Sequence, residues 1–559
     1  MISIQGKGAS VGIAVGQLQF LRREEQTVER HTGGDPYREW LRFTAARDQA
    51  VEELAALEQQ ARHEAGGDAA RFFEIHQIMA RDPDYAQAIS ELIHSQRLNA
   101  EAAVADVAEQ FAAMFAAMDD AYLRERSADV KDVSDRILAA LTGVERSRPD
   151  FDGPVVLAAD DLAPSETMQL DQRKILAFVT TGGSGASHTA ILARTMGIPA
   201  IVAIGDTLRP EYEGREVIVD GGSGTLVLDP DEAMRERMLK RQQRQRKKLQ
   251  SLRQLKALPS VTADGQKVQI CCNIGTPADV YPVLENGGEG IGLFRSEVLF
   301  LHRSQIPGED EQFDAYKRVL SAMGGKEVVI RTLDVGADKC PPSMVLPAEA
   351  NPALGTRGLR LCLNRPDLFR TQLRALYRAS AYGTLSILFP MVTSVWEVKE
   401  ARKLCRQVTD ELRAEGVPCA EDVAVGVMIE TPAAALVSDR LAKVADFFCL
   451  GTNDLTQYTL ACDRQNSDLG RFYNSRHPAV LRLVKLVAEN ARENGIRCSI
   501  CGELAAETDL TETFLALGIE QFSVAPGAVL PLREKVRAID VSQVRQRVVD
   551  DLLNDTIPL

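Results

Sequence analysis

The spacing of apolar residues changes several times along the chain, and each change predicts a different kind of element. Residues 2–20 alternate weakly and predict one or two strands. From about Tyr37 to Thr142, apolar residues recur at helical spacing in a segment rich in Ala, Leu, Glu, Gln and Arg. Breaks at residues 66–67 and 82–83 divide this segment, which predicts a helical subdomain of about four helices.

After Val144, short apolar runs separated by turn residues return. They predict strands at residues 155–158, 175–179, 200–203, 216–219 and 225–228. With the first strands, these runs predict an α/β domain made of residues 1–21 and 144–230. The helical subdomain, residues 22–143, is then an insertion in that domain.

A strongly basic stretch follows. Residues 231–256 hold ten Lys or Arg against three acids, with a sparse set of apolar residues. Basic helices also bind nucleic acid or membranes, but this stretch lacks aromatic residues and a dense apolar face. We therefore expect a long, solvated helix over residues 231–260 that links two domains.

The remaining residues, 261–559, alternate eight strand candidates with helical stretches. Eight βα units predict a TIM (β/α)8 barrel, in which the active site lies at the carboxyl ends of the strands. The candidates are residues 268–274, 290–296, 327–334, 385–392, 423–430, 446–451, 498–501 and 521–524.

Composition indicates an ordinary globular chain. Of its 559 residues, 45% are hydrophobic and 26% are charged. No apolar run approaches the ~18 residues of a membrane helix and no apolar leader is present, so we expect a cytoplasmic protein. All ten cysteines lie from Cys271 onward without the spacing of a disulfide framework, which indicates reduced thiols. Cys498 and Cys501 form a Cys-x-x-Cys pair, but no second such pair completes a zinc site.

His188 follows a Gly-rich turn between an apolar strand and a helical segment, so we place it at a helix start. The free N–H groups and the dipole of a helix N-terminus suit an anion and disfavour imidazolium. A neutral imidazole beside an anion site is a phosphoryl acceptor. On local spacing alone, a histidine that makes a structural hydrogen bond is an equally good interpretation.

Seven motifs, in order along the chain, extend the argument beyond His188. They are Ser187-His188-Thr189 and the segments 292–297 (GLFRSE), 331–339 (RTLDVGADK), 351–357 (NPALGTR), 430–435 (ETPAAA), 451–458 (GTNDLTQY) and 501–503 (CGE). In residues and in order they resemble the phosphoenolpyruvate-utilising enzymes, and in particular enzyme I of the bacterial sugar phosphotransferase system. The resemblance covers essentially the whole chain.

This resemblance implies a multidomain α/β protein, with a swivelling phosphohistidine α/β domain, an inserted helical subdomain and a C-terminal TIM barrel. It implies that the phosphoryl group of phosphoenolpyruvate passes to His188 and then to a histidine of the phosphocarrier protein HPr or a related carrier, releasing pyruvate. Residues 22–143 would dock the carrier. Residues 261–559 would bind phosphoenolpyruvate and form a homodimer.

Phosphoenolpyruvate carries a phosphate and a carboxylate, so its site requires several fixed cations. Arg295, Arg331 and Arg464 offer guanidinium groups suited to bidentate contact with phosphate oxygens. The resemblance implies that these three residues bind the substrate. Lys339 and Arg357 would add positive charge.

Glu430 and Asp454 end neighbouring predicted strands, so we expect their carboxylates to converge. Mg²⁺ favours few carboxylates, completed by substrate and water oxygens, and both residues match the metal ligands of the family. Salt bridges are the alternative role for either acid. The resemblance also places Asn453 and Asp454 against the substrate.

Cys501 follows a later strand. Phosphoryl transfer leaves the enolate of pyruvate, which needs a proton, and a thiol with a pKa near ~8.5 can deliver one. The resemblance implies this acid role for Cys501, and a buried small hydrophobe is the alternative. Thr167 matches a threonine that would fix the tautomer of His188.

One segment departs from the family's pattern, and another has two interpretations. Residues 183–187 (GSGAS) lack the arginine that usually stands beside the family's histidine. Residues 31–140 hold 21 Asp or Glu against 11 Lys or Arg, so −10 of the chain's net charge of −14 lies there. A solvated acidic face and a docking surface for a basic protein both fit this charge.

Two other functions stay open at this point. Pyruvate phosphate dikinase and phosphoenolpyruvate synthase resemble the same histidine domain and barrel, but they need an ATP-binding module. The 187 residues before His188 hold no Gly-x-x-x-x-Gly-Lys-Ser/Thr loop, which favours a protein acceptor. A weakly catalytic sensor of phosphoenolpyruvate would have no use for the proton donor Cys501.

Overall fold

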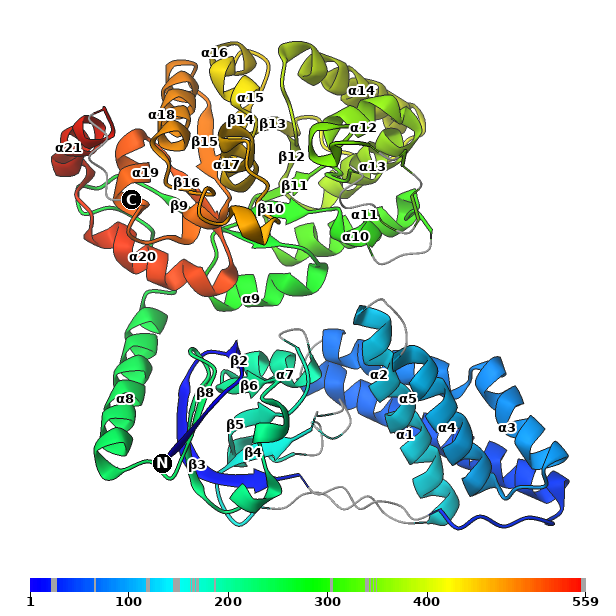
Figure 1. The fold of residues 1–559 in the computed structure, drawn as a ribbon. Coiled ribbons are helices and arrows are strands. Elements are labelled where there is room, and N and C mark those ends of the chain that lie inside the picture. The colour runs from blue at the N-terminus through cyan, green and yellow to red at the C-terminus, as the bar shows by residue number, and fades with distance from the viewer. Residues whose placement is uncertain are drawn as a thin grey trace. The chain divides into compact units, whose positions relative to one another are not determined.

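The computed structural model divides into two compact units, residues 1–248 and 249–559. Each unit folds around cores of its own, and Figure 1 shows their elements. The structure describes residues 1–21, 28–64, 67–116, 121–143, 151–160, 162, 166, 170–184, 187–301, 305–336, 341, 343–344, 346–347 and 349–553.

The first unit contains an eight-stranded sheet with the order β1-β8-β7-β3-β4-β5-β6-β2. The central strands β3 to β6 pair in parallel, and the outer strands pair antiparallel. Alternate residues of β4 enter different cores: Val156 and Ala158 pack on one side, Val155 and Leu157 on the other. The strands are β1 (Ile2–Gln5), β2 (Lys7–Ser10), β3 (Ile13–Phe20), β4 (Val155–Ala159), β5 (Ile175–Thr180), β6 (Ala200–Val202), β7 (Glu216–Asp220) and β8 (Thr225–Leu228).

Residues 2–20 form three strands rather than one or two. The additional breaks fall at Gly6 and at Gly12, whose φ of 148° is a conformation open to glycine. The helix α7 (His188–Met196) lies between β5 and β6 in the chain, where the pattern predicted a helix after β5. The strands on both sides of the helical residues pair in one sheet, and the helical residues lie between β3 and β4 in the chain.

The helical insertion contains five helices among the described residues, where the sequence predicted about four. The unpredicted break after α3 lies at residues 96–99, which contain no Gly or Pro; Arg97 takes a left-handed φ of 54° there. The helices are α1 (Pro36–Glu64), α2 (Gly67–Ala80), α3 (Pro83–Ser95), α4 (Ala100–Ala116) and α5 (Ala121–Thr142).

The basic stretch forms α8 (Glu232–Gln254), as predicted, but it is not solvated along its whole length. Met234 and Met238 pack against the apolar cluster of the first unit's sheet. Arg241 pairs with Asp220 at 2.7 Å. The amino-terminal part of α8 therefore belongs to the first unit, and the boundary between the units falls within this helix.

The second unit is a closed barrel of eight parallel strands, which confirms the predicted TIM barrel. The predicted strands extend past several observed ones at their carboxyl ends, so the polar residues there lie in loops. The strands are β9 (Gln269–Ile274), β10 (Ile291–Arg295), β11 (Val328–Arg331), β12 (Leu385–Phe389), β13 (Ala424–Ile429), β14 (Phe447–Leu450), β15 (Arg497–Ile500) and β16 (Gln521–Val524).

Helices surround this ring of strands (Figure 1). Their buried residues form the large core between helices and strands, and a smaller cluster that includes Leu293, Met428 and Cys501 fills the inside of the barrel. The helices are α9 (Val280–Glu285), α10 (Val298–Leu301), α11 (Glu309–Ala322), α12 (Leu359–Asn364), α13 (Pro366–Ala379), α14 (Val395–Ala414), α15 (Pro432–Leu436), α16 (Ser438–Leu441), α17 (Thr452–Leu460), α18 (Pro478–Glu493), α19 (Thr511–Leu517), α20 (Val529–Ala538) and α21 (Val541–Leu553).

Candidate active site

His188 is the first residue of α7, which follows β5 after a short loop. Ser187 caps the helix, and its hydroxyl accepts a hydrogen bond from the N–H of Ala190 at 3.4 Å. The first-turn N–H groups of any helix have no partner within the helix, and this is why a helix start suits an anion. The imidazole of His188, the whole of Thr167 and residues 185–186 lie outside the described part of the structure.

Two of the predicted substrate arginines end neighbouring strands of the barrel. Arg295 of β10 and Arg331 of β11 are in register, so their side chains leave the same side of the sheet. Arg331 is 8% exposed and forms ion pairs with Glu297 and, at 3.1 Å, with Asp334. Burial by itself lowers the pKa of Arg331, but the charges of Glu297, Asp334 and Glu430 raise it above its usual value. Arg295 is exposed.

Arg357 is buried among the acidic residues at the same end of the barrel, although the sequence assigned it only additional charge. It donates to both carboxylate oxygens of Asp334, at 3.0 and 3.3 Å, and to the hydroxyl of Tyr458 at 3.2 Å. Its Nη1 lies 3.6 Å from Oδ1 of Asp454. Desolvation alone lowers the pKa of Arg357, but Asp334 and Asp454 raise it, so this buried cation is held by two carboxylates.

Glu430 follows β13 and is 1% exposed. Its Oε1 accepts a hydrogen bond from the N–H of Met391 at 2.6 Å, and Met391 adopts a φ of 57° that non-glycine residues seldom take. Burial, and then the charges of Asp334 and Asp454, raise the pKa of Glu430 well above its ordinary value. A second carboxylate, that of Asp454, is therefore close enough to repel it.

Asp454 stands in the first turn of α17, just beyond β14. It is 7% exposed, and no hydrogen-bond donor among the described residues reaches its Oδ1. Arg357 and Arg464 approach that oxygen at 3.6 and 4.0 Å, beyond hydrogen-bond distance. The side chain of Arg464 is 26% exposed, so it lies at the rim of the site.

The pair Glu430 and Asp454 fits a divalent cation. Both offer hard oxygen donors, and one of these buried oxygens accepts no hydrogen bond from any described residue. Their mutual repulsion is a cost that a cation would relieve. A Cβ on Gly451 would stand 2.8 Å from Oε2 of Glu430, so glycine keeps the space beside that oxygen open. Among the described residues no third His, Cys, Asp or Glu completes a metal cluster, so other ligands would be substrate and water oxygens.

The segment 501–503 contacts the start of α17. The amide oxygen of Asn453 accepts a hydrogen bond from the N–H of Glu503 at 3.1 Å, and its amide nitrogen donates to Oε1 of Glu503 at 3.2 Å. One N–H of that amide stays available for another acceptor. Asn453 is thus oriented by Glu503, a residue to which the sequence assigned no role.

Cys501 lies just beyond β15 and is 4% exposed. Its thiol donates to the carbonyl of Leu450 at 3.4 Å and packs inside the barrel with Leu293 and Met428. A hydrogen bond with Cys449, and then burial, raise the pKa of Cys501 well above its ordinary value. Cys501 is therefore a protonated thiol at neutral pH, the form that a proton donor needs.

The structure thus brings Arg331, Glu430, Asp454, Arg464 and Cys501 to the carboxyl end of one barrel, with Arg295 and Asn453 beside them. His188 belongs to the other unit, and Lys339 lies outside the described residues. Sequence reasoning missed the side chains that hold the arginines. Glu297, Asp334 and Tyr458 all stand inside the recognised motifs. For Glu297 and Asp334, an acid near an arginine in the same motif was the available signal, and Tyr458 had no such signal.

Comparison with known protein families gives three matches along the chain. A family model described as the PEP-binding domain of PEP-utilising enzymes matches residues 249–541, where PEP is phosphoenolpyruvate. The N-terminal domain of PEP-utilising enzymes matches residues 5–126, and their mobile domain matches residues 151–224. The barrel with its carboxylates and arginines and the domain that bears His188 are thus separate parts of one family architecture.

Curated relatives match over nearly the full length. The phosphoenolpyruvate-protein phosphotransferase of Priestia megaterium is 42% identical over 542 residues, which are 97% of this chain and 95% of that protein. The chain belongs to this family of enzymes. Proteins of the same name from Staphylococcus carnosus (strain TM300) and Bacillus subtilis (strain 168) are 41% and 42% identical, over 97% and 96% of this chain and 95% and 94% of theirs.

Membership confirms the family and the fold class that the motifs predicted. The phosphoenolpyruvate-utilising enzymes need a divalent metal, and the pair Glu430 and Asp454 offers this phosphotransferase a place to hold one. None of the described helices combines the length and the apolar character that crossing a bilayer demands.

Proposed function

We propose that this phosphotransferase moves the phosphoryl group of phosphoenolpyruvate to His188 and then to a histidine of the phosphocarrier protein HPr or a related carrier, releasing pyruvate. This is the first step of the sugar phosphotransferase system. The observation that carries the proposal is the buried group at the carboxyl end of the barrel, where Arg331 and Arg357 lie beside Glu430 and Asp454. Near full-length relatives named for this reaction support it.

The arginines bind the substrate in this scheme. Arg295, Arg331 and Arg464 contact the phosphate and the carboxylate of phosphoenolpyruvate. Asp334 and Glu297 hold the guanidinium of Arg331 in place before the substrate arrives, so little reorganisation is needed as charge moves. Arg357 and Lys339 add to the positive potential, and the amide of Asn453, oriented by Glu503, faces the substrate together with Asp454.

Glu430 and Asp454 hold Mg²⁺ in this proposal, with the other positions left to substrate and water. When bound, Mg²⁺ withdraws negative charge from the phosphate oxygens and so favours transfer. The rest of the site supports these ligands. The N–H of Met391 orients Glu430, and Arg357 stands between Asp334 and Asp454.

The chemistry requires a nucleophile and an acid. The neutral imidazole of His188 attacks phosphorus, an N–P bond forms, and the bond between phosphorus and the enol oxygen breaks. The electron pair leaves with the enolate of pyruvate, whose methylene carbon takes the proton of the Cys501 thiol. Thr167 fixes the tautomer of His188, and the Cys501 thiolate regains a proton from water before the next turnover.

His188 and the substrate residues belong to different units of the chain. The transfer therefore needs the α/β domain to reach the barrel and then to leave it for the carrier. Hinges near Gly143 and in α8 would allow this movement.

The domain roles follow the same proposal. Residues 1–21 and 144–230 carry the phosphohistidine, residues 22–143 dock the carrier through their acidic surface, and residues 231–260 link the domains. Residues 261–559 bind substrate and pair two copies in a cytoplasmic homodimer. Sedimentation of the whole chain and carrier binding at rising salt test these roles, because opposite charges attract less when they are screened.

The decisive test uses labelled phosphoenolpyruvate and Mg²⁺, with the covalent label and pyruvate followed together. We expect acid-labile label on the native chain and on His94→Ala, which removes an exposed histidine of α3, but not on His188→Ala. A small histidine-bearing carrier protein should remove the label. Label chased into ATP by AMP and pyrophosphate would support a dikinase instead, and binding without label would support a sensor.

A further inference from the structure

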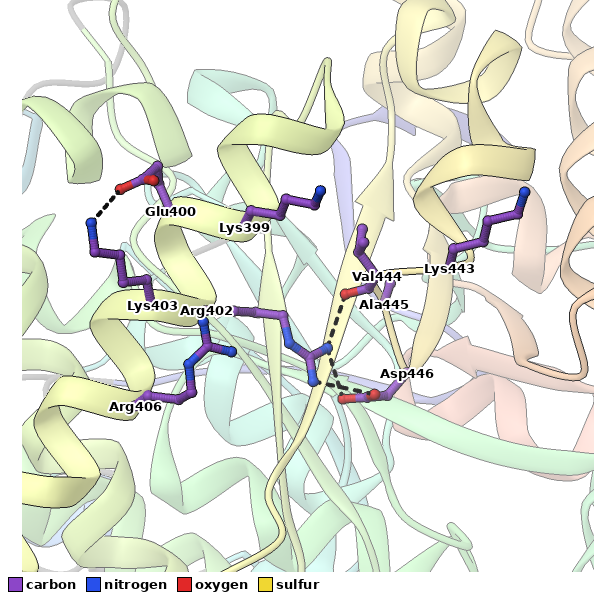
Figure 2. A pocket seen from close by; sticks show the side chains of 9 residues that line it. All are labelled: Lys399, Glu400, Arg402, Lys403, Arg406, Lys443, Val444, Ala445 and Asp446. Atoms are coloured by element: carbon purple, nitrogen blue, oxygen red, sulfur yellow. Dashed lines mark hydrogen bonds and ion pairs between the residues drawn. The ribbon is translucent and has the colours of Figure 1, made fainter.

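One face of a helix on the outside of the barrel carries a concentration of positive charge. Lys399, Arg402, Lys403 and Arg406 stand at positions i, i+3, i+4 and i+7 of α14, so they share one face of that helix. Lys443, from the segment between α16 and β14, lines the same hollow (Figure 2). The hollow has a volume of about 560 Å³.

The hollow is unusual in a chain whose net charge is −14. Five cations and two carboxylates, Glu400 and Asp446, line it, which leaves an excess of three positive charges. Lys403 lies 3.6 Å from Glu400, and Arg402 pairs with Asp446 at 3.2 Å. The other three cations, Lys399, Arg406 and Lys443, form no ion pair with any described residue.

This arrangement works against the stability of α14. Like charges four positions apart on a helix destabilise it by about 0.2–0.5 kcal/mol per pair, and Lys399 with Lys403 and Arg402 with Arg406 are two such pairs. The barrel core does not need these charges, because the buried face of the helix is made of other residues. A bound anion would remove this repulsion.

Part of the hollow is held rigidly by the barrel. The guanidinium of Arg402 also donates to the carbonyl of Val444 at 3.0 Å, and Asp446 accepts a hydrogen bond from the N–H of Val425 at 2.7 Å. Val425 and Asp446 lie at the amino ends of the parallel strands β13 and β14. The hollow is therefore at the opposite end of these strands from Glu430 and Asp454.

We infer that this hollow binds a small anion that carries at least two phosphate groups. Guanidinium and ammonium groups both suit phosphate oxygens, and the excess of three charges matches more than one phosphate. None of the described lining residues is aromatic, so binding rests on charge rather than on stacking with a base. The volume is within the range of sites for small molecules.

The test is calorimetric titration of the full chain with inorganic tripolyphosphate at low salt, with and without phosphoenolpyruvate. Mg²⁺ is present in excess so that phosphoenolpyruvate can fill its own site. We expect one equivalent to bind in both conditions. The variant Lys399→Gln/Arg406→Gln/Lys443→Gln should bind at least about 10-fold more weakly, because charge-assisted hydrogen bonds are lost. Arg402 is kept in this variant because it anchors Asp446.

The matched control removes the same charge from α8 by Arg244→Gln/Arg246→Gln/Lys247→Gln, three exposed residues, and should change affinity less than about 2-fold. Pyruvate formation without tripolyphosphate should be the same in the α14 variant as in the native chain, which shows that fold and active site are intact. Inorganic phosphate should bind more weakly than tripolyphosphate.

Four results would overturn the proposal. They are no binding by the native chain, equal weakening in the α8 control, displacement by phosphoenolpyruvate, and phosphate binding as tight as that of tripolyphosphate. If the native chain binds no tripolyphosphate and the α14 variant sediments differently from the native chain, this face is assigned instead to a protein partner, such as the acidic helices of a second copy.

Discussion

Carboxylates at the two ends of the barrel have opposite surroundings. At the amino end, Glu327 receives two hydrogen bonds from the guanidinium of Arg497, at 2.6 and 2.8 Å, and one from the hydroxyl of Ser386 at 2.7 Å. Arg497 also lies over the ring of Phe447, 5.1 Å from its centre. At the carboxyl end, Glu430 faces other acids and Asp454 has an oxygen without a donor among the described residues.

The pKa values of the two glutamates express this difference. Burial by itself raises the pKa of Glu327, but the hydrogen bonds and charge of Arg497 bring it below its ordinary value. Burial raises the pKa of Glu430 too, and the charges of Asp334 and Asp454 raise it further. A buried carboxylate with matched donors stabilises the fold, whereas a buried carboxylate beside other acids marks a candidate ligand site.

The largest expected effect is at the carboxyl end. Glu430→Gln should lower pyruvate formation by at least about 10³-fold, because a metal ligand that stabilises transferring charge is lost. Its thermal unfolding temperature should not fall, since a repelling charge is removed. Glu327→Gln is the matched control and should keep near-native turnover. Turnover of Glu430→Gln above a tenth of the native value would contradict the role of Glu430 as a metal ligand.

Cys501→Ser should lower pyruvate formation by about 10²-fold, the contribution of a positioned proton donor. Phosphoenolpyruvate binding, measured by calorimetry, should change little, because the thiol acts on the enolate formed later. Cys498→Ser is the control, since Cys498 is also buried but packs in the core outside the ring of strands. Equal losses in the two variants would point to packing rather than proton transfer.

Arg331→Lys should raise the KM for phosphoenolpyruvate and lower kcat/KM by roughly 30-fold, about 2 kcal/mol, because lysine keeps the charge but loses the planar fork. The equivalent change at the amino end, Arg497→Lys, should lower the unfolding temperature and leave kcat/KM unchanged. Steady-state kinetics and thermal scans of both variants separate binding from stability. The comparison fails if Arg497→Lys alters kcat/KM as much as Arg331→Lys does.

Glu327→Gln should destabilise the barrel by about 2–3 kcal/mol, because Arg497 would keep a partly buried charge without its carboxylate partner. Denaturant unfolding followed by circular dichroism measures this loss. Ser386→Ala removes only the third hydrogen bond and should cost about 1 kcal/mol. A larger loss for Ser386→Ala than for Glu327→Gln would contradict the assignment of the stabilisation to the ion pair.

The smallest effect is a dependence on pH. Because the folded-state pKa of Glu327 is lowered, its stabilisation is fully present above the unfolded value near ~4.3 and is lost as pH falls through the folded value. The difference in unfolding temperature between the native chain and Glu327→Gln should therefore shrink below pH ~4. A difference that stays constant from neutral pH to pH ~3 would show that proton linkage plays no part.

Much of the fold could be predicted because it depends on local pattern. The strand at residues 521–524 has the predicted bounds, because the apolar Phe522 and Val524 alternate with Gln521 and Ser523 at the spacing of a strand. The break after α3 was missed because Arg97, neither Gly nor Pro, adopts the left-handed conformation. The packing of α8 on the sheet was missed because two methionines gave too weak a pattern.

By itself, the sequence determined most element types, the barrel and the candidate residues for the proposed chemistry, because periodicity and motifs are properties of neighbouring residues. Only the tertiary structure decided which charges meet. Arg331 and Arg357 converge on Asp334, and one oxygen of Asp454 meets no donor in the described part of the chain, through contacts between residues up to about a hundred positions apart. Such pairings depend on strand register and loop paths, which are set when the whole barrel closes.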